Sequence, residues 1–539
     1  MTGSLLIRRR PQLMMARAFW LTASGALFAL VTFVTYGPAV RFSFLLDDCD
    51  AILSVLRTPY QDLLLTRHDG GYYRPLTFVL FKLLADLTRS TPSGGVSPVP
   101  YHVLEVTLHA LNSFFLTALA ARWVGRWPAT LAGLLFLVFP FSYQAVEIVG
   151  ATAHLLATAA VSLMLLCWFR ARRAQGRSRT ILLICATLAG ASAPGFHETG
   201  VLALPVFIVA CLIGASSDRQ HRRDFRCSAR RLGLPWSAIV AGAHLLYFAI
   251  WLHLPNGRPL AVTDVLPNSI VWLQAATFPV TRLLTLRPLP LSARPFLLVS
   301  AIGSLTLALT LALARIGRTA RLAALSLVCS AAAFVPSALS LSAAYVANGP
   351  RLLYTAAPGI ALYWATLVAA TSQLGRARRL LTFALLSLVV LALVQSVVFL
   401  RTRTEMGRVG SEVQEGVVTF VADHPGTPIA VIDAPTYFLP RRPEFPLGNL
   451  MHHAQAHFHG FDKLVAVRLG LSQQRPVLTL ITRSDDDSWP YRVAYHGRAT
   501  SLAELTALQR TGWAIAVVDF EQGHVRVSEL TAGAPRHGF

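Results

Sequence analysis

Residues 19–50 read FWLTASGALFALVTFVTYGPAVRFSFLLDDCD, and this stretch decides the fold. The apolar run from Phe19 to Tyr36 has about the 18 residues needed to cross roughly 30 Å of hydrocarbon. Arg8-Arg9-Arg10 precedes the run, as in a signal peptide, but no small-residue cleavage site follows it. We therefore expect a retained transmembrane helix. The acidic pair Asp47-Asp48 comes just after it, and because acid is costly at a bilayer boundary, the pair indicates a functional site.

The rest of the chain repeats this apolar pattern. The 539 residues are 54% hydrophobic and 14% charged, with a mean hydropathy of +0.53, whereas soluble proteins are about 25% charged. These values predict a polytopic α-helical membrane protein. Runs of roughly 18 residues or more give about eleven spans, near 18–38, 102–121, 129–148, 151–169, 180–194, 198–214, 235–253, 295–314, 322–341, 354–373 and 379–400.

The placement of arginine predicts the topology. Arginine-rich loops alternate with loops that carry few basic residues, and they lie at 122–126, 170–179, 219–231, 315–321 and 376–379. The positive-inside rule puts these loops and the N-terminus in the cytoplasm. The first loop (41–100), the segment 255–294 and the tail then lie outside. The net charge of +22 follows from this topology, so we expect no nucleic-acid partner and a lipid bilayer around the spans.

Two further features concern the cell and the tail. All basic residues except Lys82 and Lys463 are arginine, which is typical of a GC-rich bacterial genome and favours the bacterial inner membrane. After Leu400 the composition becomes that of a soluble protein. Short apolar segments predict buried strands at Pro428–Ile432, Val477–Ile481 and Ala514–Val518, and a helix over Leu502–Arg510. We predict a transmembrane domain over 1–404 and a small periplasmic α/β domain over 405–539.

Four local patterns, in order along residues 20–370, resemble those of GT-C glycosyltransferases that use polyprenyl-phosphate sugars. The similarity is to the protein O-mannosyltransferases and their bacterial relatives. The patterns are Asp47-Asp48 after the first span; Tyr73-Arg74-Pro75-Leu76 with Tyr101-His102 and His109-Ala110-Leu111-Asn112; Phe139-Pro140 through Leu155-Leu156-Ala157; and Arg351-Leu352-Leu353-Tyr354 with Pro358-Gly359.

The resemblance implies an inverting membrane glycosyltransferase. It would move a hexose such as mannose from a polyprenyl-phosphate donor to a hydroxyl of a protein, lipid or glycan on the periplasmic face. Such a transfer needs a base for the acceptor proton. The resemblance gives this role to Asp47, with Asp48 orienting the acceptor or helping to hold a divalent cation. Two neighbouring carboxylates titrate together, so either could carry the proton. The alternative is that both cap an interfacial helix.

Arg74 and Arg351 are the candidate donor-phosphate contacts, because a guanidinium matches phosphate oxygens bidentately. Both are expected outside, where arginine could instead reach lipid headgroups. His197 lies in the outer turn Gly195-Phe196-His197-Glu198-Thr199, where similar enzymes carry a lysine. It could donate to phosphate without being charged. Alternatively, Glu198 caps the next span.

Further residues are candidates for lining the site cavity: Tyr73, His102, His109, Glu147, His154, Glu198 and Tyr354. Three positions depart from the family pattern. Similar enzymes place a glutamate at Gln144, an arginine near Thr152 and an aspartate at His154. These departures leave the donor sugar, and activity itself, open.

The sequence offers little evidence for a metal. The six cysteines, at 49, 167, 185, 211, 227 and 329, have no CxxC spacing, so neither a metal site nor a disulfide framework is expected. Histidines 452, 453, 457 and 459 and the run Asp485 to Asp487 are interpreted as solvated polar stretches. The cofactor stays unknown, and a divalent cation at Asp47 and Asp48 is the one candidate.

Two other functions remain compatible with the sequence. A non-catalytic translocase or assembly protein for lipid-linked sugars would carry ionisable residues at mid-membrane depth. The candidate charges here cluster instead at the outer ends of several spans, which favours the enzyme. A ligase that uses diphosphate-linked donors stays open, because phosphate and diphosphate contacts look alike in sequence.

Overall fold

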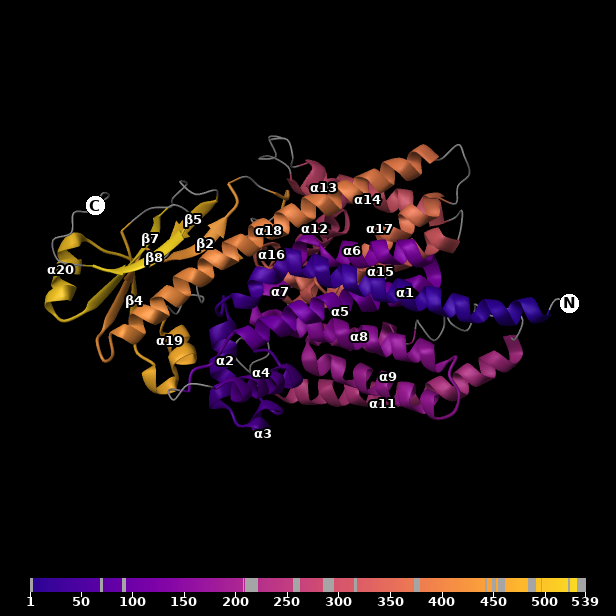
Figure 1. Ribbon diagram of the computed structural model, residues 1–539, viewed down its shortest axis with the longest axis horizontal. Helices are drawn as coiled ribbons and strands as arrows, with labels where there is room; N and C mark the ends of the chain where they lie inside the picture. The colour runs from indigo at the N-terminus through magenta and orange to yellow at the C-terminus, as the bar shows by residue number, and fades with distance from the viewer. Residues whose placement is uncertain are drawn as a thin grey trace.

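In the computed structural model, a bundle of long helices is joined at one end to a smaller unit of strands and short helices (Figure 1). The structure describes residues 3–67, 71–89, 94–206, 208, 222–254, 262–284, 295–314, 318–372, 379–441, 444–447, 452–453, 461–482, 491–495, 497–521 and 524–530. The predicted polar stretches at 457–459 and 485–487 lie outside these residues.

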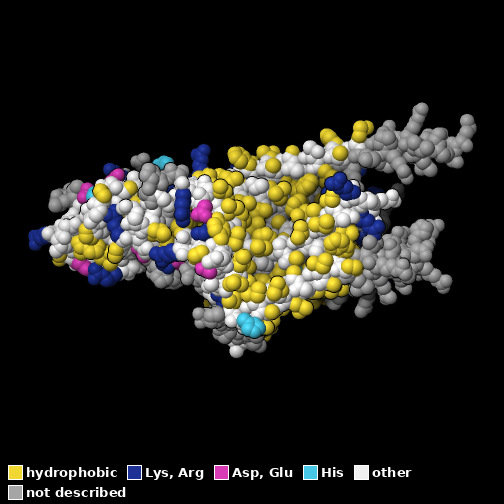
Figure 2. All heavy atoms as spheres, turned by 90° about the horizontal axis from the view of Figure 1, so that it is seen from below, with side chains coloured by type: hydrophobic (Ala, Val, Ile, Leu, Met, Phe, Trp, Pro, Cys, Tyr) yellow, Lys and Arg dark blue, Asp and Glu magenta, His cyan; other side chains and the backbone are white. Residues whose placement is uncertain are grey.

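The bundle consists of helices that follow the apolar runs of the sequence. They are α1 (Gly3–Tyr36), α5 (Val99–Val124), α6 (Arg126–Leu137), α7 (Tyr143–Glu147), α8 (Thr152–Ala171), α9 (Gly176–Phe196), α11 (Arg222–His253), α12 (Val265–Ala276), α13 (Phe278–Leu284), α14 (Pro295–Ala314), α15 (Arg318–Ser340), α16 (Ala343–Asn348), α17 (Ala357–Ser372) and α18 (Arg379–Asp423). Figure 2 shows a broad apolar surface over this bundle, as expected for helices in contact with lipid.

The span count differs from the prediction. Within the described residues, seven helices are long and apolar enough to cross a membrane, or eight if the bent pair Arg126–Leu137 and Pro140–Glu147 forms one span. Helices α14 and α17 lie where spans were predicted, but the apolar part of α14 (Pro295–Thr310) and the 16 residues of α17 fall short of the length criterion. The predicted span at 198–214 lies largely outside the described residues. The total of eleven therefore stays a prediction.

The first loop folds into short helices beside the end of the bundle that adjoins the smaller α/β unit (Figure 1). They are α2 (Asp48–Arg57), α3 (Tyr60–Leu63) and α4 (Pro75–Thr88). Acidic residues in the first turn of α2 suit the positive end of the helix dipole, and a proline is well tolerated as the first residue of α4. Short 3-10 turns complete this end: η1 (Gly37–Arg41), η2 (Pro140–Ser142), η3 (Val149–Ala151), η4 (Glu198–Leu202), η5 (Val262–Asp264) and η7 (Pro350–Leu353).

One helix, α18, runs from the bundle into the α/β unit without a break (Figure 1). Its first half is apolar, whereas its second half carries ion pairs of Arg408 with Glu405 and Glu412, three and four residues away, which support the helix on its exposed face. The predicted domain boundary at 404/405 falls inside this helix. The described part of the unit then contains β1 (Ile429–Ile432), β2 (Pro435–Leu439), β3 (His452–His453), α19 (Asp462–Leu469), η9 (Leu471–Gln473), β4 (Val477–Ile481), β5 (Arg492–Tyr495), β6 (Arg498–Ala499), α20 (Leu502–Arg510), β7 (Ala514–Glu521) and β8 (His524–Glu529).

The three predicted strands and the predicted helix of the tail are confirmed as β1, β4, β7 and α20. The main sheet has the order β6-β4-β1-β7-β8, in which only β8 is antiparallel to its neighbour. Ile429 of β1 pairs with Val477 on one side and with Ala514 on the other. Because β1 is central and parallel, all four of its residues are buried and apolar. A smaller antiparallel sheet has the order β3-β2-β5.

Candidate functional site

The two predicted catalytic aspartates have opposite environments. Asp47 is exposed and precedes α2, whereas Asp48, the first residue of α2, is wholly buried. Asp48 Oδ2 accepts a hydrogen bond from the backbone N–H of Leu45 (2.8 Å), and Oδ1 accepts one from Gly150 (2.7 Å). Asp48 therefore ties the start of α2 to the turn before α8. Of the two carboxylates, that of Asp47 is the one accessible from solvent.

A strained turn presents Asp47. Leu46 has φ of +51°, a left-handed conformation that costs a residue with a Cβ about 1–2 kcal/mol. Its side chain is buried against Ile148 and Ala151, so packing holds the turn in place. Strain of this kind collects at functional sites, where the surrounding structure maintains it.

A buried network lies behind Asp48. His102 Nδ1 is 2.8 Å from Glu105 Oε2, and Thr152 donates to Glu105 Oε1 at 2.8 Å. His102 Nε2 also lies 3.3 Å from the backbone oxygen of Ser43. Burial, and next the charge of Glu105, raise the pKa of Asp48 to about 7. The network thus connects helix α5 to both segments that Asp48 joins.

Arg74 precedes α4 and reaches across to the turn that follows α9. Its Nε donates to both carboxylate oxygens of Glu198, at 3.2 and 3.0 Å, and its Nη2 lies 2.9 Å from Oε2. The guanidinium also stacks over the ring of Tyr72, 4.1 Å from the centroid. With its side chain 13% exposed, Arg74 is held on one side and keeps N–H groups on the other.

Arg351 lies in η7, far from Arg74 in the sequence. Its Nη1 donates to Gln144 Oε1 (3.0 Å) and its Nη2 to the Tyr345 hydroxyl (2.7 Å). The carboxylate of Asp47 lies close enough for its charge to act on this guanidinium. Gln144 also donates to the carbonyl of Asn348 (3.2 Å). The amide therefore accepts from Arg351 without adding a negative charge beside it.

Two buried histidines lie near the arginines. The rings of His154 and His197 are 3.9 Å apart, and the charges of Arg74 and Arg351 both act on His154. His197 Nδ1 accepts from the backbone N–H of Thr199 (3.1 Å), so the neutral ring carries its proton on Nε2. Burial, and next Arg74, lower the pKa of His197 well below its usual value. His197 is therefore neutral near pH 7.

Each histidine has a buried nitrogen without a hydrogen-bond partner, Nδ1 in His154 and Nε2 in His197. An unpaired buried polar group costs roughly 1–3 kcal/mol. His197 Nε2 lies 3.4 Å from Glu198 Oε2, near but not hydrogen-bonded. Asp47, Arg74, Arg351, His154 and His197 thus surround one region at the end of the bundle that carries the first loop. Its cations and N–H donors suit an anion, with one exposed carboxylate beside it.

Most of the predicted cavity residues have other surroundings. Tyr73 is buried, donates to the carbonyl of Leu64 (2.9 Å) and stacks on Tyr247, while its neighbour Tyr72 contacts Arg74. His109 lies 2.8 Å from the hydroxyl of Tyr354 in the core of the bundle. 

Glu147 is also buried, and it accepts a hydrogen bond from Thr404 of α18 (2.6 Å). Of the predicted set, Glu198 pairs with Arg74, and His154 packs against His197.

The residues present do not fit a divalent cation. Asp48 is buried with both oxygens on backbone N–H groups, and Glu198 is engaged by Arg74, which leaves Asp47 as one available carboxylate. Among the described residues, no three His, Cys, Asp or Glu side chains converge as metal ligands. Divalent cations of the magnesium type prefer several oxygen ligands.

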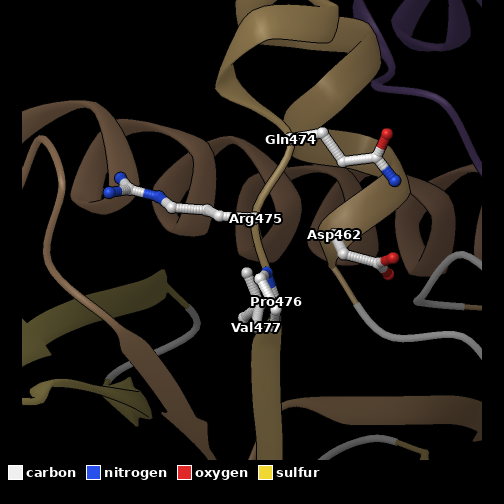
Figure 3. A pocket seen from close by; sticks show the side chains of 5 residues that line it. All are labelled: Asp462, Gln474, Arg475, Pro476 and Val477. Atoms are coloured by element: carbon white, nitrogen blue, oxygen red, sulfur yellow. The ribbon is translucent and has the colours of Figure 1, made fainter.

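A cavity of about 320 Å³ lies elsewhere, in the α/β unit, lined by Asp462, Gln474, Arg475, Pro476 and Val477 (Figure 3). It is at the amino end of β4, whereas parallel sheets bind ligands at the carboxyl ends of their strands. The Arg475 side chain points away from those of Asp462 and Gln474 in Figure 3. Arg475 donates to backbone carbonyls at the end of α18, so these groups do not converge on a ligand.

The sequence reasoning missed three residues of this region: Glu105, Tyr72 and Tyr345. Glu105 carried a signal, because a carboxylate inside an apolar span, one turn from His102, is rare without a function. Tyr72 and Tyr345 carried none, since an aromatic residue in an outer loop is ordinary.

No known protein family and no curated protein matches the chain. Among solved structures, ArnT from Cupriavidus metallidurans in the apo state is 14% identical, with a TM-score of 0.43 and 93% of each chain covered. The same protein bound to undecaprenyl phosphate is also 14% identical, with a TM-score of 0.41. The match covers 93% of this chain and 92% of that one. 

The archaeal oligosaccharyltransferase AglB from Archaeoglobus fulgidus, in complex with an inhibitory peptide and a dolichol-phosphate, is 11% identical, with a TM-score of 0.39. The match covers 85% of this chain and 65% of that one. Because all these TM-scores are below 0.5, no residue role is transferred from them.

Proposed function

We propose that this chain is a membrane glycosyltransferase that moves a hexose from a polyprenyl-phosphate donor to an acceptor hydroxyl, with inversion. The observation that carries the proposal is the convergence of Arg74, Arg351 and two buried histidines with unpaired nitrogens beside the exposed Asp47. Cations and N–H donors suit a lipid phosphate, and the carboxylate suits the base that takes the acceptor proton. Mannose is the first sugar to test, from the family resemblance.

In this proposal, Arg74 and Arg351 hold the phosphate from two sides. The leaving phosphate gains negative charge as the bond to the sugar breaks, and fixed cations stabilise that charge more than they stabilise the bound donor. His197 Nε2–H donates a further hydrogen bond and gains the acceptor that it lacks. Asp47 accepts the proton from the attacking hydroxyl on the opposite face of the anomeric carbon. Asp48 stays buried and acts only through the position of Asp47.

The proposed location is the bacterial inner membrane, with the N-terminus in the cytoplasm and the site and the α/β unit in the periplasm. The arrangement of charge supports it. The arginine-rich turn between α8 and α9 (170–179) lies at the end of the bundle opposite the α/β unit (Figure 1), and positive charge is favoured on the cytoplasmic side.

The test uses the full-length protein in nanodiscs and measures release of free polyprenyl phosphate from a panel of polyprenyl-phosphate sugars, with membrane extract as acceptor. Asp47→Asn should lower kcat by roughly 10²- to 10⁴-fold, the usual contribution of a general base, with donor binding retained. Asp86→Asn, in the same loop, is the matched control and should behave as the wild type. Donor binding without turnover in the wild type would refute transfer and favour the translocase.

A further inference from the structure

The segment from Ser43 to Arg57 carries Asp47. Residues of α18 and of the α/β unit, far along the chain, contact this segment. Its apolar side chains, among them Phe44, Cys49 and Ile52, share one hydrophobic cluster with Val413 of α18 and Val465 of α19. In Figure 1, α2 lies next to α19, a helix of the α/β unit close to the bundle. The first loop and the α/β unit therefore bury their apolar surfaces against each other.

Polar contacts fix the segment on both sides of Asp47. Before it, the backbone N–H of Ser43 donates to Ser411 Oγ of α18 (2.7 Å), in a buried position. After it, Asp50 forms an ion pair with Lys463 of α19. At the end of α2, Arg57 donates to Gln474 Oε1 (2.6 Å).

The Asp50–Lys463 pair is the strongest candidate for a specific hold. Their side chains are 23% and 25% exposed, so solvent and salt screen the pair less than an ion pair on the open surface. Asp50 lies in the first turn of α2, immediately after the residues that set the position of Asp47. Lys463 is one of two lysines in a chain that otherwise uses arginine.

The far end of the first loop is docked as well. The backbone N–H of Val96 donates to the carbonyl of Val467 (2.9 Å), and Arg468 Nη1 donates to the carbonyl of Val96 (3.1 Å). A Cβ at Gly95 would lie 2.1 Å from the carbonyl oxygen of Arg468, so only glycine allows this approach. Both ends of the loop thus rest on α19.

We propose that the α/β unit holds the segment Ser43–Arg57 in its active position, and that Lys463 is a positioning residue for Asp47. The positioning role of Lys463 rests on the proposed function. Small displacements of a base are costly, since a shift of about 1 Å can reduce a rate by roughly 10²-fold. The α/β unit therefore contributes to catalysis from outside the site, through α2.

The test compares Asp50→Lys, Lys463→Asp and the double exchange of the two charges in the full-length protein in nanodiscs. Arg498→Asp is the matched control, because it reverses a surface ion pair with Glu504 inside the α/β unit. Hydrogen exchange of peptides from 43–57 measures how firmly the α/β unit fixes this segment. Turnover and the donor KM report its effect on the reaction.

Each single variant should speed exchange in 43–57 and lower kcat by roughly 10- to 100-fold, with the donor KM within about twofold of the wild type. The double variant, with the two charges swapped, should restore most of the slow hydrogen exchange in 43–57 and most of kcat. A variant that was merely misfolded would not recover in this way. The Arg498 control should change neither.

Unchanged exchange in both single variants would overturn the hold. Faster exchange with normal kcat would overturn the positioning role. Absence of transfer in the wild type would refute the proposed function, and the exchange result would still confirm or refute the hold on the segment.

Discussion

Replacing Glu105 with glutamine should change how the stability of the protein depends on pH. The pKa of Asp48 is about 7 in the folded protein, raised first by burial and next by Glu105. In an unfolded chain the same group titrates near 3.8. Between these pH values the folded state binds more protons than the unfolded state. The free energy of unfolding therefore falls as pH rises from about 4 to about 7 and is level above that.

The size of the effect follows from this elevation. An elevation of about 3 pH units corresponds to about 4 kcal/mol, of which about 3 kcal/mol falls between pH 5 and pH 8. Glu105→Gln removes a negative charge beside Asp48 and should lower its pKa by on the order of one unit, because burial remains the larger cause. The stability lost between pH 5 and pH 8 should then be about half as large.

The assay is thermal unfolding of the purified protein in detergent at pH 5 and pH 8, comparing the difference between the two midpoints within each variant. This difference cancels any loss that is independent of pH. At roughly 1–2 °C per kcal/mol for a chain of this size, the variant should differ from the wild type by about 2 °C. Glu504→Gln, on the α/β unit, is the control. Equal pH differences in the wild type and Glu105→Gln would refute the coupling of Glu105 to Asp48.

Three further substitutions test other parts of the structure. Gln144→Glu should raise the donor KM by roughly tenfold, since its carboxylate would neutralise Arg351; an unchanged KM measured in nanodiscs would contradict this role. Gly133→Ala should destabilise the protein by about 1–3 kcal/mol in thermal unfolding, because its Cβ would lie 2.1 Å from Thr117 Oγ1. Tyr354→Phe should lower the free energy of unfolding by about 1–3 kcal/mol in the same assay, because the buried side chains of His109 and Asn112 lose their hydrogen bonds to the Tyr354 hydroxyl.

The helices and strands could be predicted because apolar periodicity and run length determine them. The strand at Val477–Ile481 matches the structure to the residue, and the predicted span at 235–253 lies within α11 and ends at the same residue. The continuity of α18 past residue 404 could not be predicted, because the composition changes there while the helix continues on ion pairs such as Arg408–Glu412. Composition indicates whether a segment is surrounded by lipid or by water, and it does not indicate the backbone conformation.

The site was predictable only in part. Charge at the outer ends of spans pointed to Arg74 and Arg351, and the structure brings them together with His197. The difference between Asp47 and Asp48 could not be read from sequence, because it depends on the backbone N–H of Gly150, about a hundred residues away. Tyr72 and Tyr73 illustrate the same limit, since adjacent side chains point to different partners.

The unbroken length of α18 has a mechanical consequence. From Arg401 to Asp423 it extends beyond its apolar half by 23 residues, or roughly 34 Å. A tilt of about 5° in the part within the lipid would move the far end by roughly 3 Å. Bilayer thickness sets the tilt of such helices, so a thinner or thicker membrane would press the α/β unit against the first loop or draw it away. The lipid composition of the membrane would then change the geometry of the site through the tilt of α18.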